Sequence, residues 1–394
     1  MTAEGSFPRV LFLGNVFPLP SDDGTKMRIR HLLQAVASVT VVDFFTLHGD
    51  DDPLGDADEL GVARVGGIRR AEAWRARPPA RWALSSLPRP WAYRDVSAAR
   101  RAVARFARDG YDLVWYSRVE TYLTFGPIPA RRHVIDFDVL EDERLATSAR
   151  IEHRPALRSM ADRIDRARWH KVQQRVAARV DLSIVCNARD RRRLGGRSVT
   201  IVPNGYEEQR PITRTPSSAP TVGFVGSFAY GPNIDAARTL IEEVMPAVRS
   251  QVTDSRLLLV GRRGEELFGT DTPPWVHTTG YVESVEPWLE PIDVMAVPVR
   301  YGGGTRIKIL EALCHRIPLV AYRYATEGID VVDRIHAILV ETPDELADGV
   351  TALLRRPEEG ERLAASGRRL FETRYRWSSI REQVAALVAE LTQR

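Results

Sequence analysis

The stretch DVMAVPVRYGGGTRIKILEAL, residues 293–313, contains the pattern from which the fold can be worked out. Its first seven residues form an apolar run of strand length, three glycines follow shortly after, and the later apolar residues have helical spacing. We therefore expect a strand, a glycine turn and a helix. A strand that leads directly into a helix is the unit from which parallel sheets are built.

The glycine turn and its helix carry polar groups that suit a phosphate-bearing ligand. Glycines at 302–304 allow backbone amides to approach closely, and Thr305 is a good N-cap for a helix whose free amides favour an anion. Thr305, Lys308 and Glu311 are spaced by three, so they form one polar stripe. A phosphate followed by a sugar diol would satisfy all three side chains, whereas a glycine loop before an ordinary capped helix remains the alternative.

The same alternation of strand and helix patterns continues outward in both directions. RVLFLG is followed by the amphipathic GTKMRIRHLLQAVA, then by VTVVDFFTL, YDLVWYS, RHVIDFDV, VDLSIVC and VTIVPNG. A second series begins with TVGFVGSF and the helix NIDAARTLIEEVMPAVRS, and continues with RLLLVG, VHTTGYV, DVMAVPV, IPLVAY and AILVE. This rhythm predicts parallel sheets covered by helices on both faces.

A polar, proline-rich segment, GYEEQRPITRTPSSAPT, separates the two series and is interpreted as a linker. We therefore predict an α/β protein with two Rossmann-like domains, residues 1–204 and 205–372, facing each other across a cleft. Residues 373–394 are predicted to form a helix that packs back on the first domain. Ligands of such sheets bind beyond the carboxyl ends of the strands, so loops after strands are the places to look for function.

Composition limits the classes of function. The chain has 394 residues and a net charge of +4, and lysine occurs only at Lys26, Lys171 and Lys308, with arginine as the main basic residue. No nucleic-acid-binding module is recognisable, and the apolar runs are far shorter than a membrane span. Cys186 and Cys314 lie in apolar segments and are expected to be buried thiols. We expect a cytoplasmic protein without metal or other cofactor, at most peripherally attached to a membrane.

With its surroundings, the opening stretch resembles the family-four retaining glycosyltransferases, which have the GT-B fold. GGGTRIKILEAL followed by IPLV and TEGI is similar to their C-terminal signature, and PLPSDDGTKMRIRHLLQAV to their N-terminal loop. IVPNG resembles their interdomain junction, FVGSFAYGPNIDAAR the start of their second domain, TGYVESVEPWLEPIDVMAVPV their nucleotide-base region, and YRWSSI their crossing C-terminal helix. The resemblance covers nearly the whole chain, in the family's order and spacing.

The resemblance implies a glycosyltransferase, of hexosyltransferase type, that uses a UDP- or GDP-type sugar donor. Glu311 matches the second glutamate of the family's paired glutamates, which holds the donor ribose, whereas the first position is Gly303. Ser227 stands where relatives have an arginine, so Arg306 and Lys308 are expected to supply the phosphate-binding charge. Lys26 is expected in the N-terminal phosphate loop. Expected donor-binding residues are Gly24, Gly226, Ser227, Arg262, Tyr281, Val282, Gly302, Gly303, Gly304, Thr305 and Glu311.

Lys308 and Arg306 are the catalytic candidates of the second domain, and Asp138 is that of the first. Relatives often have a histidine after the strand that matches RHVIDFDV, and here Asp136 or Asp138 occupies that region. A strand-end cap is the alternative role for either aspartate. The acceptor is not indicated by the sequence.

Two other segments have unusual composition. Residues 69–94 are rich in arginine and tryptophan and interrupted by prolines, which suits contact with an acceptor or a membrane, or a plain surface excursion. A long helix is expected around 143–180, where Glu152, Asp162 and Asp165 lie among arginines, as on a solvated face.

Three functions are consistent with these patterns. The first is retaining transfer of a sugar from a nucleotide-diphosphate sugar to an acceptor hydroxyl of a glycan, a lipid-linked compound or a small natural product. The second is a nucleotide-sugar epimerase on the same fold, which would interconvert sugars without an acceptor. The third is a non-catalytic partner that binds a nucleotide sugar tightly without turnover.

Overall fold

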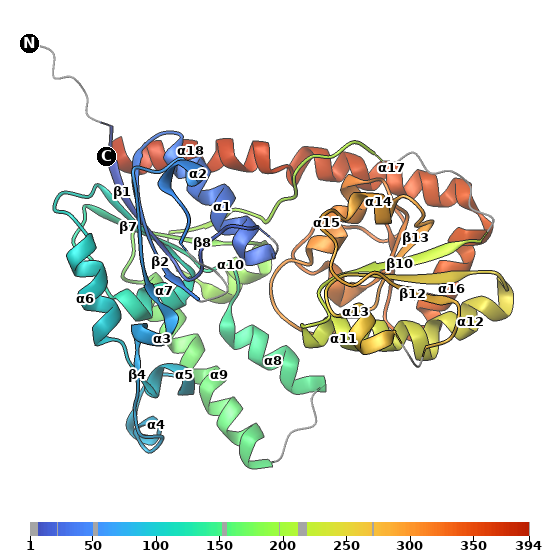
Figure 1. The fold of residues 1–394 in the computed structure, drawn as a ribbon, viewed down its shortest axis with the longest axis horizontal. Coiled ribbons are helices and arrows are strands. Elements are labelled where there is room, and N and C mark those ends of the chain that lie inside the picture. Colours follow the sequence, from blue (N-terminus) through green and yellow to red (C-terminus); the bar gives the residue numbers. More distant parts are fainter. Residues whose placement is uncertain are drawn as a thin grey trace, which may run out of the picture. The chain divides into compact units, whose positions relative to one another are not determined.

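The computed structural model describes residues 7–21, 23–49, 54–151, 156–196, 198–211, 219–269 and 272–393. The chain divides into two compact units, Met1–Asn204 with Ser378–Arg394, and Gly205–Trp377. Each unit has one large parallel sheet with helices on both faces (Figure 1). The predicted α/β class with two parallel-sheet domains is therefore confirmed.

The first unit is built on a seven-stranded sheet of order β3-β2-β1-β6-β7-β8-β9, in which all neighbours are parallel. The strands are β1 Arg9–Gly14, β2 Val41–His48, β3 Arg64–Arg69, β6 Leu113–Ser117, β7 Arg132–Asp136, β8 Leu182–Val185 and β9 Val199–Ile201. Helices α1 Gly24–Ala37, α2 Ala57–Leu60, α6 Ser97–Phe106, α7 Arg118–Phe125 and α10 Ala188–Leu194 connect them. The side on which the chain adds strands changes after β3, from outside β1 to the other side of β1, so the switch point of this sheet lies between β1 and β6.

The second unit repeats this plan with six parallel strands of order β12-β11-β10-β13-β14-β15. They are β10 Thr221–Val225, β11 Arg256–Val260, β12 Val276–Thr278, β13 Val294–Val297, β14 Leu319–Tyr322 and β15 Ile338–Val340. The helices are α11 Gly231–Thr239, α12 Met245–Gln251, α13 Gly264–Phe268, α14 Glu286–Leu289, α15 Ile307–Cys314, α16 Pro343–Arg355 and α17 Pro357–Arg374. Its switch point lies between β10 and β13.

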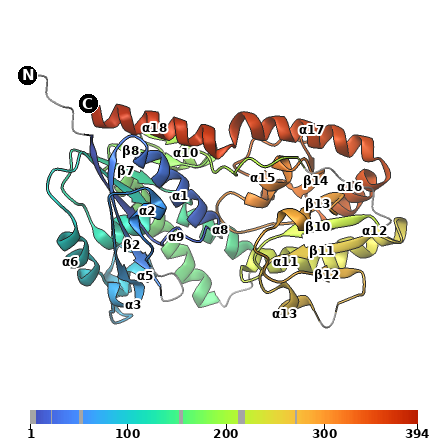
Figure 2. The ribbon, with the colours of Figure 1, turned by 45° about the horizontal axis from the view of Figure 1, so that its top comes forward.

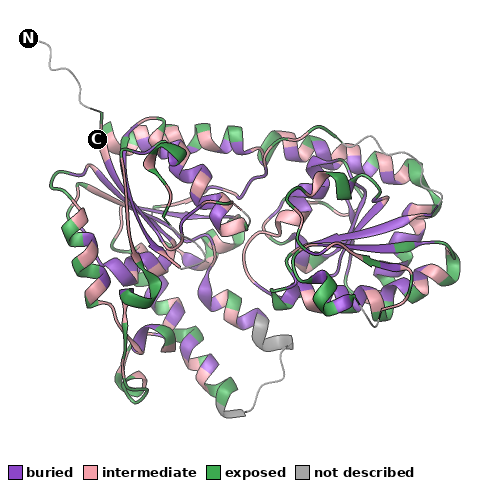
Figure 3. Cartoon of the chain, viewed as in Figure 1, coloured by how far each residue is buried: buried purple, intermediate pink, exposed green. Residues whose placement is uncertain are grey.

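Burial explains why these strands are recognisable as uninterrupted apolar runs. β6 and β13 are buried along their whole lengths, because helices cover both faces of each sheet (Figure 3). In the first unit Phe12 and Trp115 stack across neighbouring strands with ring centroids 5.6 Å apart. Cys186 and Cys314 are both free and buried, as predicted.

The last helix, α18 Trp377–Gln393, runs along the first unit beside α1 (Figure 2). Arg381 on α18 and His31 on α1 are joined by a 3.0 Å contact between Nη1 and Nδ1. Burial and the neighbouring arginines 381 and 30 lower the pKa of His31 to about 3. The imidazole is therefore neutral near pH 7, and its Nδ1 accepts the bond from the guanidinium.

Strand β3 is not recognisable from apolar alternation, because two of its six residues are glycine. A Cβ atom on Gly66 would lie 2.6 Å from the ring of Phe106, so the close packing of α6 on the sheet requires a residue without a side chain. Because glycine carries no side chain, β3 shows no alternation of apolar and polar side chains in the sequence.

Two helical predictions need correction. The helix expected around 143–180 is two packed helices, α8 Glu141–Ile151 and α9 Ala156–Ala177. Glu152, like the other residues between these two helices, lies outside the described residues. The predicted helix 233–250 contains a π turn, η1 Leu240–Val244, just before Pro246, which has no N–H for the helical ladder.

The solvated face expected for Asp162 and Asp165 is also wrong, since both side chains are buried. Asp165 accepts bonds of 2.9 Å from the indole of Trp82 and from the backbone N–H of Arg89. Arg89 also pairs with both carboxylates. These aspartates therefore anchor the arginine- and tryptophan-rich segment, which contains α3 Arg70–Ala73, β4 Arg75–Ala76, α4 Arg81–Leu84, α5 Arg89–Ala92 and β5 Arg94–Asp95.

Among the described residues no helix combines the length and apolarity needed to cross a membrane.

Candidate functional site

The carboxyl ends of β10 and β13 bring the glycine loop of residues 302–304 to the switch point of the second sheet. Gly226 and Ser227 follow β10 directly, and α15 begins a few residues after β13. Parallel strands end at one edge of the sheet, so these loops from distant parts of the sequence meet there. This edge is the candidate site of the second unit.

The glycine loop is shaped by two tyrosines that the sequence did not indicate. The hydroxyl of Tyr324 donates a 2.6 Å bond to the carbonyl of Gly302, and the N–H of Gly303 lies 3.4 Å from the hydroxyl of Tyr230. Gly302 and Gly304 have φ angles of 110° and 77°, which other residues rarely adopt. The loop is therefore held in one conformation by contacts to its backbone.

The helix after the loop begins one residue later than predicted, and Thr305 is not its N-cap. The cap position of α15 is Arg306, which makes no capping bond with its side chain. The left-handed backbone at Gly304 and the non-helical Arg306, with ψ at 93°, delay the start of the helix. Thr305 therefore lies in the loop, while Lys308 and Glu311 keep their spacing of three on the helix.

Arg306 folds back over the loop. Its Nη1 donates a 2.8 Å bond to the carbonyl of Gly304, and its guanidinium lies 4.4 Å from the ring centre of Tyr324. Its Nη2 is buried and has no hydrogen-bond partner among the residues that the structure describes. One donor of this guanidinium is therefore left for a further acceptor.

Lys308 places its ammonium at the end of β10. Nζ donates a 2.7 Å bond to Asn233 Oδ1 and lies 4.2 Å from the ring centre of Phe224. A Cβ atom on Gly226 would come within 2.8 Å of Nζ, so the ammonium lies against this glycine. Asn233 is itself fixed by a 2.8 Å bond to the carbonyl of Ser227. Asn233 was not predicted, and its position in a helix pattern gives no signal for this role.

Glu311 lies one helical turn beyond Lys308 and is 5% exposed. Its Oε1 accepts a 3.1 Å bond from the hydroxyl of Tyr206, which is also buried. Tyr206 directly follows the junction motif IVPNG and was not identified as a site residue. Its hydroxyl fixes one oxygen of the carboxyl group.

The two charged side chains of α15 both have pKa values displaced toward neutrality. Burial lowers the pKa of Lys308 to about 7, with Glu311 acting against the shift and Arg306 adding to it. Burial raises the pKa of Glu311 to about 7, against the effects of Tyr206 and Lys308. Neither group is fully charged at pH 7, so an ionic ligand can change the charge of both.

The remaining predicted donor residues of this unit are open to solvent or nearly so. Ser227, Arg262 and Tyr281 are exposed, and Val282 is half-buried. The guanidinium of Arg262 lies 5.4 Å from the ring centre of Tyr281, so these two side chains are brought together.

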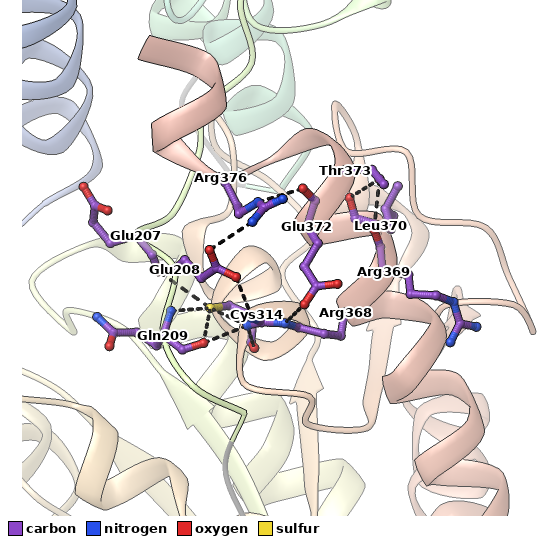
Figure 4. Close-up of polar contacts among 10 residues, drawn as sticks. All are labelled: Glu207, Glu208, Gln209, Cys314, Arg368, Arg369, Leu370, Glu372, Thr373 and Arg376. Atoms are coloured by element: carbon purple, nitrogen blue, oxygen red, sulfur yellow. Dashed lines mark hydrogen bonds and ion pairs between the residues drawn. The ribbon is translucent and has the colours of Figure 1, made fainter. Parts of the chain in front are cut away.

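The far end of α15 is fixed by Arg368 of α17 (Figure 4). Arg368 donates to the backbone carbonyls of Cys314 and Gln209, the latter at 2.8 Å. It also pairs with Glu208 at 2.9 Å and Glu372 at 2.7 Å. This network holds α15, and with it Lys308 and Glu311, against the segment that contains Tyr206.

In the first unit, Arg28 of α1 is the central residue at the carboxyl edge. It is 1% exposed and makes two 2.7 Å bonds to the two oxygens of Asp136, which ends β7. Arg28 also donates to Asn204 Oδ1 at 3.0 Å. Burial raises the pKa of Asp136, and Arg28 counteracts the shift. Asp136 is fully buried, so its role is to hold Arg28.

Asp138 lies two residues later with a left-handed φ of 51° and is 8% exposed. Its Oδ1 accepts a 3.2 Å bond from Asn204 and is 3.9 Å from Arg28 Nε. Of the two aspartates, Asp138 is therefore the one with surface left for a ligand. Gly24 begins α1 in this same unit, and Lys26 in its first turn is buried at 6% exposure.

Arg28 was missed by the sequence analysis, although a signal existed. It precedes Ile29 within the amphipathic helix 24–37 and lies four residues before Leu32, on the buried side. A cation at a buried helical position needs a carboxylate partner, and Asp136 at the end of a predicted strand was available.

Comparisons with known proteins agree with this architecture. Residues 219–356 match the family described as Glycosyl transferases group 1. Sucrose-phosphate synthase from Thermosynechococcus elongatus is 18% identical, with a TM-score of 0.69 over 97% of this chain and 99% of that one. HepE from Anabaena, solved with UDP-glucose, is 15% identical with a TM-score of 0.62 over 97% and 99%. A glycosyltransferase from Rickettsia africae is 10% identical with a TM-score of 0.60 over 98% of both chains.

At these identities the solved structures establish the fold, which is the predicted GT-B fold. No curated protein sequence matches the chain significantly. The family match covers β10 to α16, and it confirms the resemblance and the assignment as a glycosyltransferase.

The buried pair in the first unit yields a stability prediction. Arg28→Met leaves the carboxylate of Asp136 buried without a counter-charge, so it should lower the free energy of unfolding by about 3–5 kcal/mol. The double variant Arg28→Met/Asp136→Leu should recover most of that loss, because it removes both charges together. Urea denaturation followed by tryptophan fluorescence measures both. A double variant as unstable as the single one would contradict the pairing as the cause.

Proposed function

Because residues 219–356 form a glycosyl transferases group 1 domain, we propose that the chain transfers a sugar, with retention of anomeric configuration, from a nucleotide-diphosphate sugar to an acceptor hydroxyl. The donor would bind at the switch point of the second sheet. The observation that carries this proposal is the placement of the Lys308 ammonium against Gly226, with Glu311 one helical turn further along.

The diphosphate would lie between the end of β10 and the glycine loop. Lys308 Nζ and the partnerless Nη2 of Arg306 are the cationic donors at this edge. Negative charge grows on the diphosphate as the glycosidic bond breaks, so a fixed cation there stabilises the transition state more than the bound donor. In front-face transfer the departing diphosphate also takes the proton of the acceptor hydroxyl.

Glu311 would hold the ribose diol of the nucleotide. One of its oxygens accepts a hydrogen bond from the hydroxyl of Tyr206. A carboxylate has about four acceptor sites, so sites remain for the two ribose hydroxyls. Tyr206 and the Arg368 network would therefore act as positioning residues for this contact. In the first unit, Asp138 is the candidate that contacts the acceptor, since it follows the carboxyl end of β7 and retains exposed surface.

A UDP-sugar is the first donor to try. HepE, which shares the fold, was solved with UDP-glucose and in another crystal with UDP and glucose. The exposed Arg262 and Tyr281, which stack at the carboxyl edge, would contact the base. The absence of a carboxylate at Gly303 leaves the sugar itself to be found by experiment.

The function is tested by incubating the full chain with UDP-glucose, UDP-galactose, UDP-N-acetylglucosamine and GDP-mannose against a panel of acceptors. The expected result is release of a nucleoside diphosphate that depends on acceptor, with the product's anomeric configuration, read by NMR, equal to the donor's. Interconversion of the sugar without acceptor would show an epimerase instead. Tight binding of a donor without turnover against the whole panel would indicate a non-catalytic binding protein.

The proposal predicts a specific defect for Lys308→Ala. Loss of the cation should lower kcat by about ten-fold or more, beyond any rise in the donor KM, because the charge acts mainly in the transition state. Lys171→Ala, which removes an exposed lysine of α9, is the matched control and should leave turnover unchanged. A higher donor KM with unchanged kcat would limit Lys308 to binding.

Glu311→Ala should weaken binding of UDP-glucose by about ten-fold or more, because it removes a hydrogen bond to a charged group worth about 1.5–3 kcal/mol. In the free protein the Glu311 carboxyl has a raised pKa of about 7. Lowering the pH from 7 to 6 protonates Glu311, which weakens the ribose contact, and also protonates Lys308, which strengthens the diphosphate contact. In Glu311→Gln the first effect is absent, so calorimetry should show its affinity rising over this range relative to the wild type, and Glu290→Ala, an exposed glutamate, should bind like the wild type.

A further inference from the structure

The proposed function makes no use of a cavity of about 360 Å³ in the first unit. The arginine- and tryptophan-rich segment forms one side of it, and the end of α7 with Gly126 and Pro127 forms another. Its volume lies within the range of small-molecule sites, roughly 300–1,000 Å³. We name this cavity the arginine pocket, because four of its lining residues are arginine.

The charges that line the arginine pocket are unbalanced. The arginines are Arg77, Arg94, Arg100 and Arg179, and the one carboxylate among the lining residues is Asp95. Asp95 is already engaged, by Arg77 at 3.4 Å and by the hydroxyl and N–H of Ser97. Across the described part of the chain, the other three arginines form no ion pair. Arg100 Nη2 donates a weak 3.5 Å bond to the carbonyl of Leu123, so these three guanidinium groups carry positive charge that no carboxylate of the lining balances.

The pocket also has an apolar wall. Trp91 and Tyr122 are largely buried and belong to the core cluster, with Leu87 and Leu123 packed against it. The guanidinium of Arg94 lies 4.0 Å from the ring centre of Trp74 and 5.1 Å from that of Trp91. Burial and the nearby Arg70 lower the pKa of Arg94, although Glu120 acts against them. An added anion would relieve this crowding of positive charge.

The location of the pocket separates it from the carboxyl edge of the sheet. Helix α7 starts at Arg118, directly after the carboxyl end of β6, and runs eight residues to Phe125. At 1.5 Å per residue its two ends are roughly 10 Å apart. Leu123 and Gly126 lie toward or just beyond the second end, so this part of the lining lies away from the carboxyl end of β6.

We propose that the arginine pocket binds the phosphate group of an amphipathic organic phosphate. Arg100 and Arg179 donate hydrogen bonds to the phosphate oxygens, since the paired N–H donors of a guanidinium group match the geometry of a phosphate. The apolar part of the ligand lies on Trp91 and Leu123. Such a group is found both on soluble metabolites and in the headgroups of membrane lipids. The inference does not depend on the proposed sugar transfer.

The experiment uses phenyl phosphate as the probe, titrated into the full chain by calorimetry with UDP at saturating concentration, so that a nucleotide site is blocked. One phenyl phosphate should bind per chain, and inorganic phosphate more weakly because it lacks the apolar part. Arg100→Ala should lower the affinity about ten-fold or more. Arg101→Ala, the exposed neighbour on α6 that does not line the pocket, is the control and should bind as the wild type does.

A variant that binds phenyl phosphate more tightly than the wild type cannot be explained by misfolding, as a loss of affinity could be. Asp95→Asn removes the carboxylate from the lining and releases Arg77, so it should raise the affinity for phenyl phosphate several-fold. The proposal is overturned if phenyl phosphate does not bind at millimolar concentration, or if Arg100→Ala and Arg101→Ala bind it equally.

Vesicles distinguish the two sources of the phosphate. The ligand is a lipid headgroup if the chain sediments with phosphatidylglycerol vesicles but not with phosphatidylcholine vesicles. The double variant Arg100→Ala/Arg179→Ala should then no longer sediment with phosphatidylglycerol vesicles. If phenyl phosphate binds as predicted and the vesicles do not, the ligand is a soluble metabolite. Failure of phenyl phosphate to bind rejects the pocket as a phosphate site, whatever the vesicles show.

Discussion

The second unit is organised around one electrostatic constraint, which is that α15 carries a cation and a carboxyl group into a poorly hydrated edge of the sheet. Within the described residues, Lys308 has no carboxylate at ion-pair distance, and its ammonium is held by the neutral amide of Asn233 and the face of Phe224. A buried charge without a counter-charge costs free energy unless a ligand supplies one. The glycine loop, Tyr206 and the Arg368 network all serve to keep this charged helix in place.

The first unit has the same strand order, but its central cation, Arg28, is paired with a carboxylate. Arg28 is fully paired, with two bonds to Asp136 and others to the segment that follows β9. Nothing is left for a ligand at that guanidinium, and the pair fixes α1 and β7 to one another. A paired cation gives a rigid frame, whereas an unpaired one gives a binding site, and the two sheets illustrate both.

Prediction from the sequence succeeded where burial alone decides the pattern. Strands that are buried along their whole lengths, such as β6 and β13, are continuous apolar runs, and the switch-point site follows from strand order. It failed where a contact between distant residues decides. Gly66 packs against Phe106, and Arg28 is paired with Asp136. Both partners are distant in sequence, so a local pattern cannot identify them, although the buried helical position of Arg28 signals that it needs a carboxylate.

The burial of Lys308 also changes its chemistry as a nucleophile. Burial lowers the pKa of Lys308 to about 7, so a much larger share of its amines is unprotonated at neutral pH than in an ordinary lysine of pKa about 10.4. The chain has only three lysines. Amine-directed acylating reagents would therefore find one side chain of unusual reactivity, at the very place where we propose that the donor diphosphate binds, and the bound donor would shield it.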